Sequence, residues 1–204
     1  MVKKNKSAFR EYAEAILIAL VLALFIRTFV VQAFKIPSGS MEPTLAIGDH
    51  ILVNKFIYGV KIPFTSIRLL PFEKPERGDV IVFIYPVEPD KDFIKRVIGV
   101  PGDSVQIVNK KLYLNGVEAK DPHAVYKEDT LFPSETQKRD NFGPIEVPEG
   151  NLFVMGDNRD RSLDSRFWGF VPMVDVLGKA FIIYWSWDRE NFRVRWSRIG
   201  DLIR

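Results

Sequence analysis

The longest run of apolar residues lies near the start of the chain. Every residue from 15 to 26 is apolar, and after an interruption at Arg27 the apolar character resumes as far as Phe34. A helix needs about 20 predominantly apolar residues to cross the hydrocarbon core of a bilayer. The pattern therefore predicts a single transmembrane anchor helix over residues 12–34, with Arg27 close enough to its far end for the guanidinium to reach the headgroups.

The residues before this helix predict its orientation. They include four basic residues: Lys3, Lys4, Lys6 and Arg10. Basic flanks stay on the cytoplasmic side of a membrane, so we expect residues 1–11 to be cytoplasmic and the body of the chain to lie on the other side. A cleaved signal peptide is the alternative, because residues 31–33 (Val-Gln-Ala) resemble a small-residue cleavage site. The apolar pattern alone leaves this alternative open.

The rest of the chain has apolar residues at alternate positions, in short segments rich in β-branched and aromatic side chains. Such segments lie at residues 80–85, 93–98, 105–107, 111–114, 152–155 and 180–187. A period of two over a short segment bounded by Gly, Pro, Asp or Asn is typical of β-strands. The sequence therefore predicts a mostly β fold that follows the single N-terminal helix.

Residues 104–150 differ from the sequence on either side, since they hold more charged and turn-forming residues. Within them, Asn115 and Gly116 form a strong signal for a two-residue hairpin turn. We therefore expect residues 104–150 to form a small inserted β subdomain. Residues 35–103 together with 151–204 are expected to form the β core.

The composition limits the chemistry of any active site. The 204 residues include no Cys and only two His. His50 fits the alternation of a strand better than the role of a base, and His123 has no obvious partner. The sequence therefore gives no support for a disulfide framework, a thiolate nucleophile or a zinc site. The net charge of +3 is small and scattered, which argues against a nucleic-acid partner. Nothing in the sequence requires a metal ion or another cofactor.

A turn-rich segment directly after the apolar run is a candidate site for a nucleophile. Residues 37–45 read Pro-Ser-Gly-Ser-Met-Glu-Pro-Thr-Leu. Proline restricts φ and glycine permits unusual φ values, so this frame can hold the hydroxyls of Ser38 and Ser40 in a defined pose. Most Pro/Ser/Gly clusters are ordinary turns, and this segment by itself does not separate the two interpretations.

Lys95 is a candidate general base. In a strand over residues 93–98, Lys95 and Arg96 point to opposite faces, so one of the two cations must project among apolar side chains. Burial disfavours the charged form of a lysine and lowers its pKa from about 10.4 towards the neutral range. The alternative is an edge strand with both cations in water.

Residues 155–169 hold a third candidate constellation, in which Asp, Arg, Asn and Ser alternate between an apolar strand and Phe167–Trp168. Such a segment is either a solvated loop with ion pairs or a buried polar network. A buried network could supply a hydroxyl that orients a neutral lysine.

Together, these segments resemble a known family. Ser-Gly-Ser-Met-Glu-Pro-Thr-Leu after an apolar helix is followed by Lys-Arg-Val-Ile-Gly-Val-Pro-Gly-Asp, then by Gly-Asp-Asn-Arg-Asp and Ser-Leu-Asp-Ser-Arg-Phe-Trp-Gly. In this order the motifs are similar to those of bacterial type I signal peptidases, also called leader peptidases. The resemblance extends from the apolar helix to residues 178–180. It implies a membrane-anchored serine protease with a Ser/Lys dyad, a mostly β catalytic core, a variable β insert, and no metal ion or cofactor.

The resemblance also implies roles for individual residues. Ser40 matches the nucleophile and Lys95 the general base, while Ser38 matches the hydroxyl that forms the oxyanion hole with the backbone N–H of Ser40. Ser162 matches the serine that hydrogen-bonds the lysine. The remaining matches are a supporting ion pair and the lining of the substrate groove: Asp164 with Arg166, and Phe34, Ile36, Met41, Leu45, Phe93 and Ile94.

Some features depart from the family pattern. Arg161 occupies a position that often holds Asn or a small polar residue, the insert is short, and only one apolar helix precedes the candidate nucleophile. None of these departures touches the Ser/Lys dyad. They therefore bear on the subgroup and not on the reaction.

The activity implied by the resemblance is the removal of signal peptides from exported preproteins after small residues, at Ala-X-Ala-type sites. It places the enzyme in the cytoplasmic membrane of a bacterium, with its catalytic domain on the extracytoplasmic face. The implied partners are signal peptides, the lipid bilayer and the protein-export machinery, with no nucleic acid. Two alternatives are a self-cleaving repressor of the Ser/Lys type, which needs a DNA-binding domain before its catalytic part, and a secreted β-rich binding protein.

An aromatic cluster lies near the C-terminus of the chain: Tyr184, Trp185, Trp187, Phe192 and Trp196. Amphipathic aromatic side chains favour the membrane interface, but they also pack well in the core of a β fold. The sequence therefore predicts that the cluster lies either at the membrane interface or in the β core, and it does not decide between the two.

Overall fold

The computed structural model describes residues 8–61, 68–69 and 72–204. Its helices are α1 (Ala8–Phe29) and the single-turn α2 (Ser165–Trp168). Its strands are β1 (Val31–Lys35), β2 (Asp49–Asn54), β3 (Val60–Lys61), β4 (Arg68–Leu69), β5 (Val80–Ile84), β6 (Asp92–Gly99), β7 (Ser104–Val108), β8 (Lys111–Leu114), β9 (Val117–Glu118), β10 (Phe142–Glu146), β11 (Asn151–Met155), β12 (Val171–Pro172), β13 (Val176–Asp188) and β14 (Arg193–Val194). Short 3₁₀ turns lie at Gly39–Met41, Arg159–Arg161, Met173–Asp175 and Trp196–Arg198.

The body of the molecule is built on an antiparallel sheet of eight strands. Seven follow in the order β1-β2-β13-β5-β6-β11-β12, and β14 pairs with β13. The 13-residue strand β13 lies inside the sheet, where it pairs with β2 on one side and β5 on the other. Alternate positions face the core, as in β2, where Ile51 and Val53 are completely buried. The mostly β fold predicted from the sequence is confirmed.

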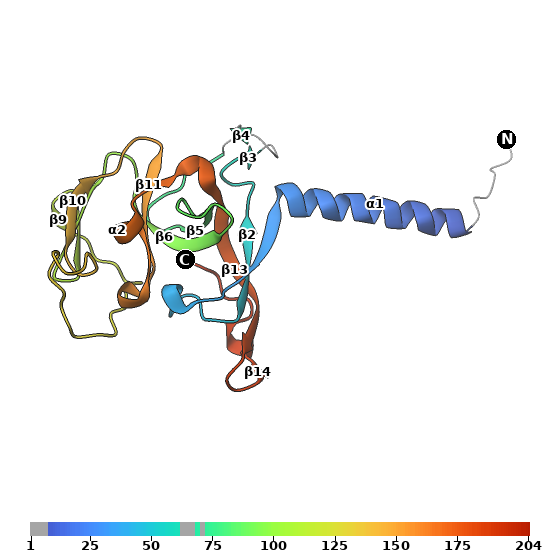
Figure 1. The fold of residues 1–204 in the computed structure, drawn as a ribbon. Coiled ribbons are helices and arrows are strands. Elements are labelled where there is room, and N and C mark those ends of the chain that lie inside the picture. Colours follow the sequence, from blue (N-terminus) through green and yellow to red (C-terminus); the bar gives the residue numbers. More distant parts are fainter. Residues whose placement is uncertain (1–7, 62–67, 70–71) are drawn as a thin grey trace.

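The N-terminal helix differs from the predicted anchor over residues 12–34. α1 ends at Phe29, and Val31 begins strand β1, in which Phe34 pairs with Ile51 of β2. The apolar run is thus divided between a helix and an edge strand, because its last residues gain hydrogen-bonding partners along β2. α1 projects away from the sheet as a rod (Figure 1). None of the helices in the described ranges is long and apolar enough to span a membrane.

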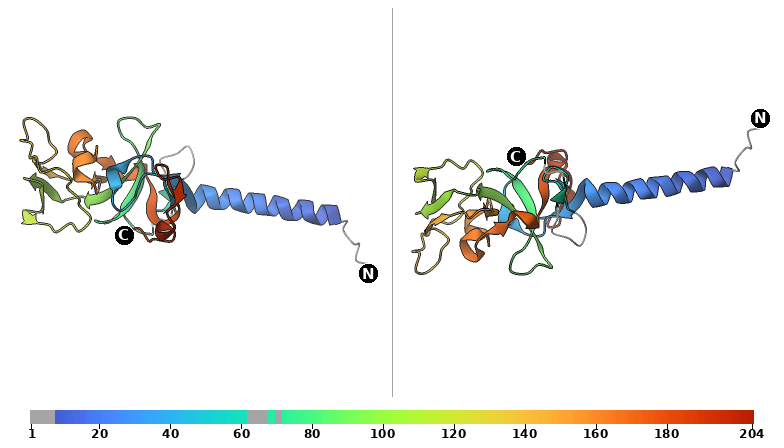
Figure 2. Two further views of the ribbon diagram at one scale, coloured as in Figure 1. Left: turned by 90° about the horizontal axis from the view of Figure 1, so that it is seen from below. Right: turned by 90° about the horizontal axis from the view of Figure 1, so that it is seen from above.

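A separate four-stranded sheet, in the order β10-β7-β8-β9, lies within residues 104–150. Asn115 and Gly116 form the turn between β8 and β9, and both have positive φ, at 53° and 79°. A buried cluster that includes Val105 of β7 and Phe153 of β11 joins this sheet to the main one. The smaller sheet lies at the end of the molecule opposite α1, which both views of Figure 2 show.

The aromatic cluster near the C-terminus lies mostly on the surface. Trp196 and Phe192 are 73% and 81% exposed, and Tyr184 and Trp185 are also exposed. The rings of Trp185 and Trp196 meet edge to face, with their centroids 6.2 Å apart. Packing in the β core, which was one of the two predictions for this cluster, is therefore wrong for these four residues.

Candidate active site

The side chains of Ser40 and Lys95 meet in the interior of the body. Ser40 lies in the 3₁₀ turn Gly39–Met41 that follows β1, and Lys95 lies in β6. The Nζ atom of Lys95 is 2.9 Å from the Oγ atom of Ser40, although the residues are 55 positions apart. Ser40 is 9% exposed and Lys95 is 4% exposed. The two atoms are within hydrogen-bond distance, so a proton can pass between them directly.

Burial controls the charge of Lys95. Removal from water lowers the pKa of Lys95 from 10.5 to about 8, against the opposing effect of the negative charges of Asp164 and Asp157. The ammonium also donates to the carbonyl oxygen of Ile94 at 3.0 Å, and it lies 5.3 Å from the ring centroid of Phe93. A lysine in such surroundings has a substantial neutral fraction near pH 8, which is what a general base requires.

The turn that carries Ser40 is fixed to the segment after β11. The backbone N–H of Asn158 donates to the carbonyl oxygen of Ser40 at 3.1 Å, and the side-chain Nδ2 of Asn158 donates to the carbonyl oxygen of Gly39 at 3.1 Å. Farther along the turn, the hydroxyl of Thr44 donates to Oδ2 of Asp157 at 2.5 Å. These bonds hold both ends of the turn and limit the movement of Ser40 relative to Lys95.

Both cations of β6 are buried, although the strand pattern required only one to be. Arg96 is buried and donates two hydrogen bonds to Asp157, from Nε to Oδ1 at 2.8 Å and from Nη2 to Oδ2 at 2.7 Å. The alternative of an edge strand with both cations in water is therefore wrong. Arg96 is neutralised by a carboxylate, whereas Lys95 hydrogen-bonds to a hydroxyl and a carbonyl, so only the lysine is left in surroundings that favour its neutral form.

Asp164 and Arg166 form a second buried ion pair. Nε of Arg166 lies 2.8 Å from Oδ1 of Asp164, and Nη2 lies 2.8 Å from Oδ2. Burial acts to raise the pKa of Asp164, but the charge and hydrogen bonds of Arg166 outweigh it and hold that pKa below its usual value. Arg166 also donates to the carbonyl oxygens of Arg139 and Arg159, at 2.8 and 2.7 Å. The pair thus ties the insert to the segment that supports Ser40.

Ser162 has different partners from those expected. Its Oγ atom accepts the backbone N–H of Gly156 at 3.1 Å, and its hydroxyl donates to Asp164. Across the described ranges, no hydrogen bond joins Ser162 to Lys95. Gly156 lies closely between Ser162 and the turn that carries Ser40. A Cβ atom at this position would lie 2.4 Å from both Oγ of Ser162 and the carbonyl oxygen of Ser40.

A cavity of about 390 Å³ opens beside Ser40 and Lys95. Its wall is formed by Ser38, Gly39, Ser40, Glu42, Ile47, Phe93, Lys95, Asn158, Arg161 and Leu163. Ser38 is exposed at the start of the turn, so its hydroxyl is accessible from the cavity. The cavity can therefore admit a peptide to the Ser40 hydroxyl.

The predicted groove residues are placed differently from the expectation. Phe93 lies in the cavity wall, but the other five do not. Ile36, Met41 and Leu45 are buried in the core beneath the turn, and Phe34 and Ile94 pack against the same cluster. Met41 and Leu45 therefore anchor the turn to the sheet, and the apolar side chains in the wall of this cavity are Phe93, Ile47 and Leu163.

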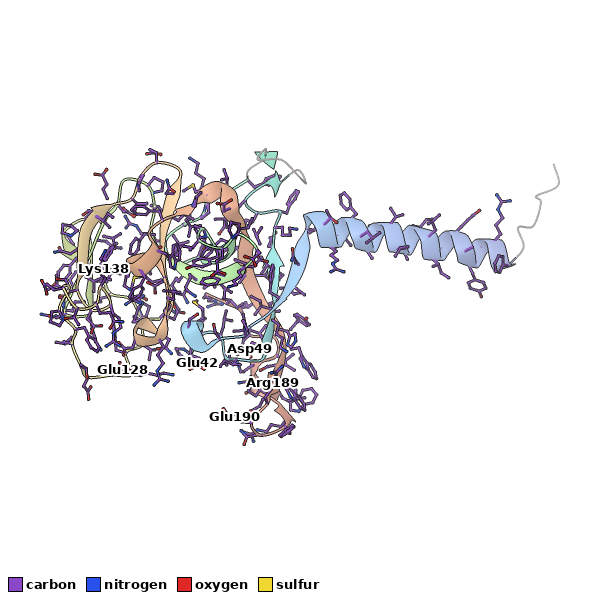
Figure 3. The ribbon with its side chains drawn as sticks, in the orientation of Figure 1. Glu42, Asp49, Glu128, Lys138, Arg189 and Glu190 are labelled. Atoms are coloured by element: carbon purple, nitrogen blue, oxygen red, sulfur yellow. The ribbon has the colours of Figure 1, made fainter. Side chains whose placement is uncertain are left out.

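Several residues of this site were missed in the sequence. Asn158 and Thr44 lie inside the motifs that carried the resemblance, so their position in those motifs was the available signal. Lys127 of the insert has no such signal, since it pairs at 2.8 Å with Glu42, which is 85 positions away. Figure 3 shows Glu42 beside the turn, on the same edge of the molecule as Glu128 of the insert. Within the described residues, no three His, Asp or Glu side chains come together so that they could hold a metal ion.

Comparison with known proteins decides the family. The profile of the family described as "Signal peptidase, peptidase S26" matches residues 9–185. The chain belongs to this family. The signal peptidase I of Pseudomonas aeruginosa is 41% identical, over 93% of this chain and 78% of its own length. The signal peptidase I of Aquifex aeolicus is 39% identical, over 87% of this chain and 84% of its own length. A crystal structure of a signal peptidase I from Enterococcus faecalis is 38% identical, with a TM-score of 0.42, and covers 52% of this chain and 97% of its own.

The signal peptidase family consists of serine endopeptidases, so the chain is an enzyme of that class. The resemblance found in the sequence motifs is confirmed. The alternative of a secreted binding protein without enzymatic activity is wrong.

Proposed function

We propose that this signal peptidase removes signal peptides from exported preproteins by attack of the Ser40 hydroxyl, with Lys95 as the general base. The observation that carries the proposal is the 2.9 Å contact between Lys95 Nζ and Ser40 Oγ in a buried setting that favours the neutral amine. A serine hydroxyl is a weak nucleophile until a neighbouring base takes its proton. In this proposal Lys95 takes that role.

The reaction begins with neutral Lys95. Its Nζ atom takes the hydroxyl proton of Ser40 as Oγ attacks the carbonyl carbon of the scissile peptide bond. The tetrahedral intermediate then collapses, the C–N bond breaks, and the leaving amine takes the proton from Lys95. The mature protein departs with a new N-terminus, and the signal peptide stays on Oγ as an ester. Lys95, neutral again, takes a proton from the water that attacks the ester, and hydrolysis restores Ser40.

We assign the oxyanion hole to the hydroxyl of Ser38 and the backbone N–H of Ser40. Two donors aimed at the developing negative charge stabilise a tetrahedral intermediate more than its ground state. Support comes from the position of Ser38 in the cavity wall beside Ser40. In this scheme Asp164, Arg166 and Ser162 support the site by fixing Gly156 and do not contact the substrate.

Cleavage after small residues, at Ala-X-Ala-type sites, is the proposed specificity. In an extended peptide, the residue before the cut and the one two positions earlier point to the same side. Both would enter the cavity, whose wall includes Phe93 and the Ser40 turn. We expect alanine to be accepted at both positions, and a phenylalanine or lysine directly before the cut to be rejected.

We further propose that the enzyme works at the cytoplasmic membrane with its body on the extracytoplasmic face. α1 supports this, because its apolar side chains from Ile16 to Ile26 are exposed on all sides of the helix, a pattern that a water-exposed helix does not tolerate. The basic residues before and at the start of α1 favour a cytoplasmic N-terminus. Protease added to spheroplasts should digest the body, and protection of the body would contradict this orientation. Contact with the protein-export machinery is an expectation that follows from the substrate class.

The experiment that tests the mechanism is cleavage of a model preprotein by the purified enzyme and four variants. Ser40→Ala and Lys95→Met remove the two reacting groups. Ser134→Ala and Lys138→Met make the same chemical changes at exposed positions of the insert. We expect the first two variants to lose cleavage and the two controls to keep it. Cleavage by Ser40→Ala at a comparable rate would overturn the assignment of the nucleophile.

A further inference from the structure

Arg161 is a cation in the wall of the active-site cavity with no role in the mechanism above. It ends the 3₁₀ turn Arg159–Arg161 and lines the same cavity as Ser40 and Lys95. Its neighbour Arg159 is buried and donates to Gly156 O and to Asp121. The side chain of Arg161 is instead 67% exposed. Arg159 therefore stabilises the fold around the turn, whereas Arg161 faces the cavity that the substrate must enter.

The positive charge of Arg161 is not neutralised by a close acidic neighbour. In the part of the chain that the structure describes, its one ion pair is with Glu128, at 3.9 Å between Nε and Oε1. The other oxygen of Glu128 already accepts a bond from Arg139 at 2.6 Å. The acidic residue in the cavity wall, Glu42, is paired with Lys127 at 2.8 Å. Both carboxylates near Arg161 thus have a closer cation, and its guanidinium keeps free donors.

A guanidinium in this position attracts carboxylates at every working pH. Arginine cannot lose its charge, and its planar group of donors matches a carboxylate in two bonds. Lys95 must be neutral for catalysis, so it does not share this role. The residues before the cut offer no place for an acidic side chain, because the first and third must be small and the second points away from the cavity.

We propose that Arg161 is a specificity-determining residue that favours preproteins with Asp or Glu among the first residues after the cut. The proposal rests on the proposed function, since it takes Ser40 as the point of cleavage. Arg161 binds the acidic side chain of the mature segment and orients it as the scissile bond reaches Ser40. Its position in the chain is the one where the sequence departs from the Asn or small polar residue often found in the family.

The test uses the full-length enzyme in detergent and peptides that carry an Ala-X-Ala cleavage site. Pairs of peptides differ only by Glu or Gln at the first, second or third position after the cut. At low salt we expect the wild-type enzyme to cleave the Glu peptide with a kcat/KM about twofold to fivefold higher at one of these positions, the range of an exposed ion pair. At about 1 M salt, where the Debye length falls to about 3 Å, the preference should shrink.

Variants that remove or reverse the charge of Arg161 show whether this residue causes the preference. Arg161→Gln should remove the Glu preference, and Arg161→Glu should replace it with a preference for Lys at the same position. Lys138→Gln, an equal loss of charge at an exposed position of the insert, should leave the Glu preference intact. Equal rates on the Glu and Gln peptides at all three positions would overturn the proposal while leaving the signal peptidase mechanism standing. Failure of the wild-type enzyme to cut any of the peptides, or cutting by Ser40→Ala, would overturn both.

Discussion

Arg96 and Asp157 are joined by two hydrogen bonds, Nε to Oδ1 at 2.8 Å and Nη2 to Oδ2 at 2.7 Å, with both side chains fully buried. Arg96 also donates to the carbonyl oxygen of Gly78 at 2.7 Å, and Asp157 accepts the hydroxyl of Thr44. The pair therefore connects β6, which carries Lys95, to the turn that carries Ser40. The pair thus helps to hold Lys95 and Ser40 at their distance from each other, although it contacts neither side chain.

The first prediction concerns the stability that this pair provides. Arg96→Gln leaves the carboxylate of Asp157 buried without a cation, and breaking a buried pair in this way costs about 3–5 kcal/mol. Lys111→Gln removes one partner of the exposed pair with Glu118 and should cost less than about 1 kcal/mol. Urea denaturation measures both. If the two variants lose the same amount, the Arg96–Asp157 pair does not organise the core.

The second prediction concerns the space at Gly156. A methyl group there would lie 2.4 Å from both the carbonyl oxygen of Ser40 and Oγ of Ser162, and both contacts are too close to persist unchanged. Displacement of a reacting group by about 1 Å can lower the rate about 100-fold, and we expect Gly156→Ala to reduce kcat by at least that factor.

Gly178→Ala is the matched control for Gly156→Ala. Its Cβ atom would lie 2.4 Å from the carbonyl oxygen of Asn54, an equally close contact between β13 and β2. This variant should unfold at a lower denaturant concentration, while the folded fraction keeps its kcat. A similar loss of kcat in both variants would show that general damage to the fold, and not the position of Ser40, explains the effect.

The sequence predicted the parts of the site that depend on local pattern. The alternation of β6 predicted that Lys95 or Arg96 would lie among apolar side chains, and the stiff segment 37–45 offered two hydroxyls, on Ser38 and Ser40. The resemblance to the family then singled out Lys95 and Ser40. The burial of Arg96 could not be predicted, because it depends on Asp157, a residue 61 positions away. The hydrogen bond from Gly156 to Ser162 was missed for a similar reason. Gly156 comes close to the carbonyl oxygen of Ser40 only when the end of β11 packs against the Ser40 turn.

The boundaries of α1 show a different limit of prediction from sequence. Three of the residues 31–34 are apolar and continue the pattern of the helix, so hydropathy alone extends the predicted anchor through them. They become a strand because β2 offers them a complete set of pairing partners. The groove residues show a similar limit, since nothing in the sequence separates an apolar side chain that faces a cavity from one that packs beneath it. Of the six, Phe93 lines the cavity beside Ser40.

The third prediction concerns the exposed aromatic side chains near the C-terminus. Phe192 and Trp196 project from the β13–β14 hairpin and the 3₁₀ turn that follows it, and such residues favour the membrane interface. A chain starting at residue 30 keeps β1 and removes α1. We expect it to bind phospholipid vesicles in a flotation assay, and the double variant Phe192→Ser with Trp196→Ser to bind less.

The control for vesicle binding changes two exposed apolar residues of the insert, Val117→Ser with Leu131→Ser. It removes apolar surface from the insert and should leave vesicle binding unchanged. Near-ultraviolet circular dichroism should show that each shortened chain is folded. Equal binding by the two double variants would contradict a membrane contact through the C-terminal aromatic residues.

The last prediction separates activity from stability at Lys95. Its pKa is about 8 in the folded protein and 10.5 in the unfolded chain. Between these values the unfolded state binds more protons, so the penalty for burying Lys95 is full below pH 8 and fades as the pH rises towards 10.5. At about 1.36 kcal/mol per pKa unit, the penalty at neutral pH is about 3 kcal/mol. Activity should rise with pH up to about 8, because the neutral base becomes available over that limb.

Lys95→Met keeps most of the side-chain volume and removes the titrating amine. It should abolish cleavage while leaving the protein as stable as the parent, or more stable, at pH 7, and its stability should no longer rise between pH 8 and 10.5 through this group. Lys95→Arg should be both inactive and less stable, because a guanidinium cannot shed its charge when buried. Denaturation at several pH values, together with cleavage of a preprotein, measures these effects. A loss of several kcal/mol in Lys95→Met, or residual cleavage by it, would show that Lys95 is a structural residue and not a buried base.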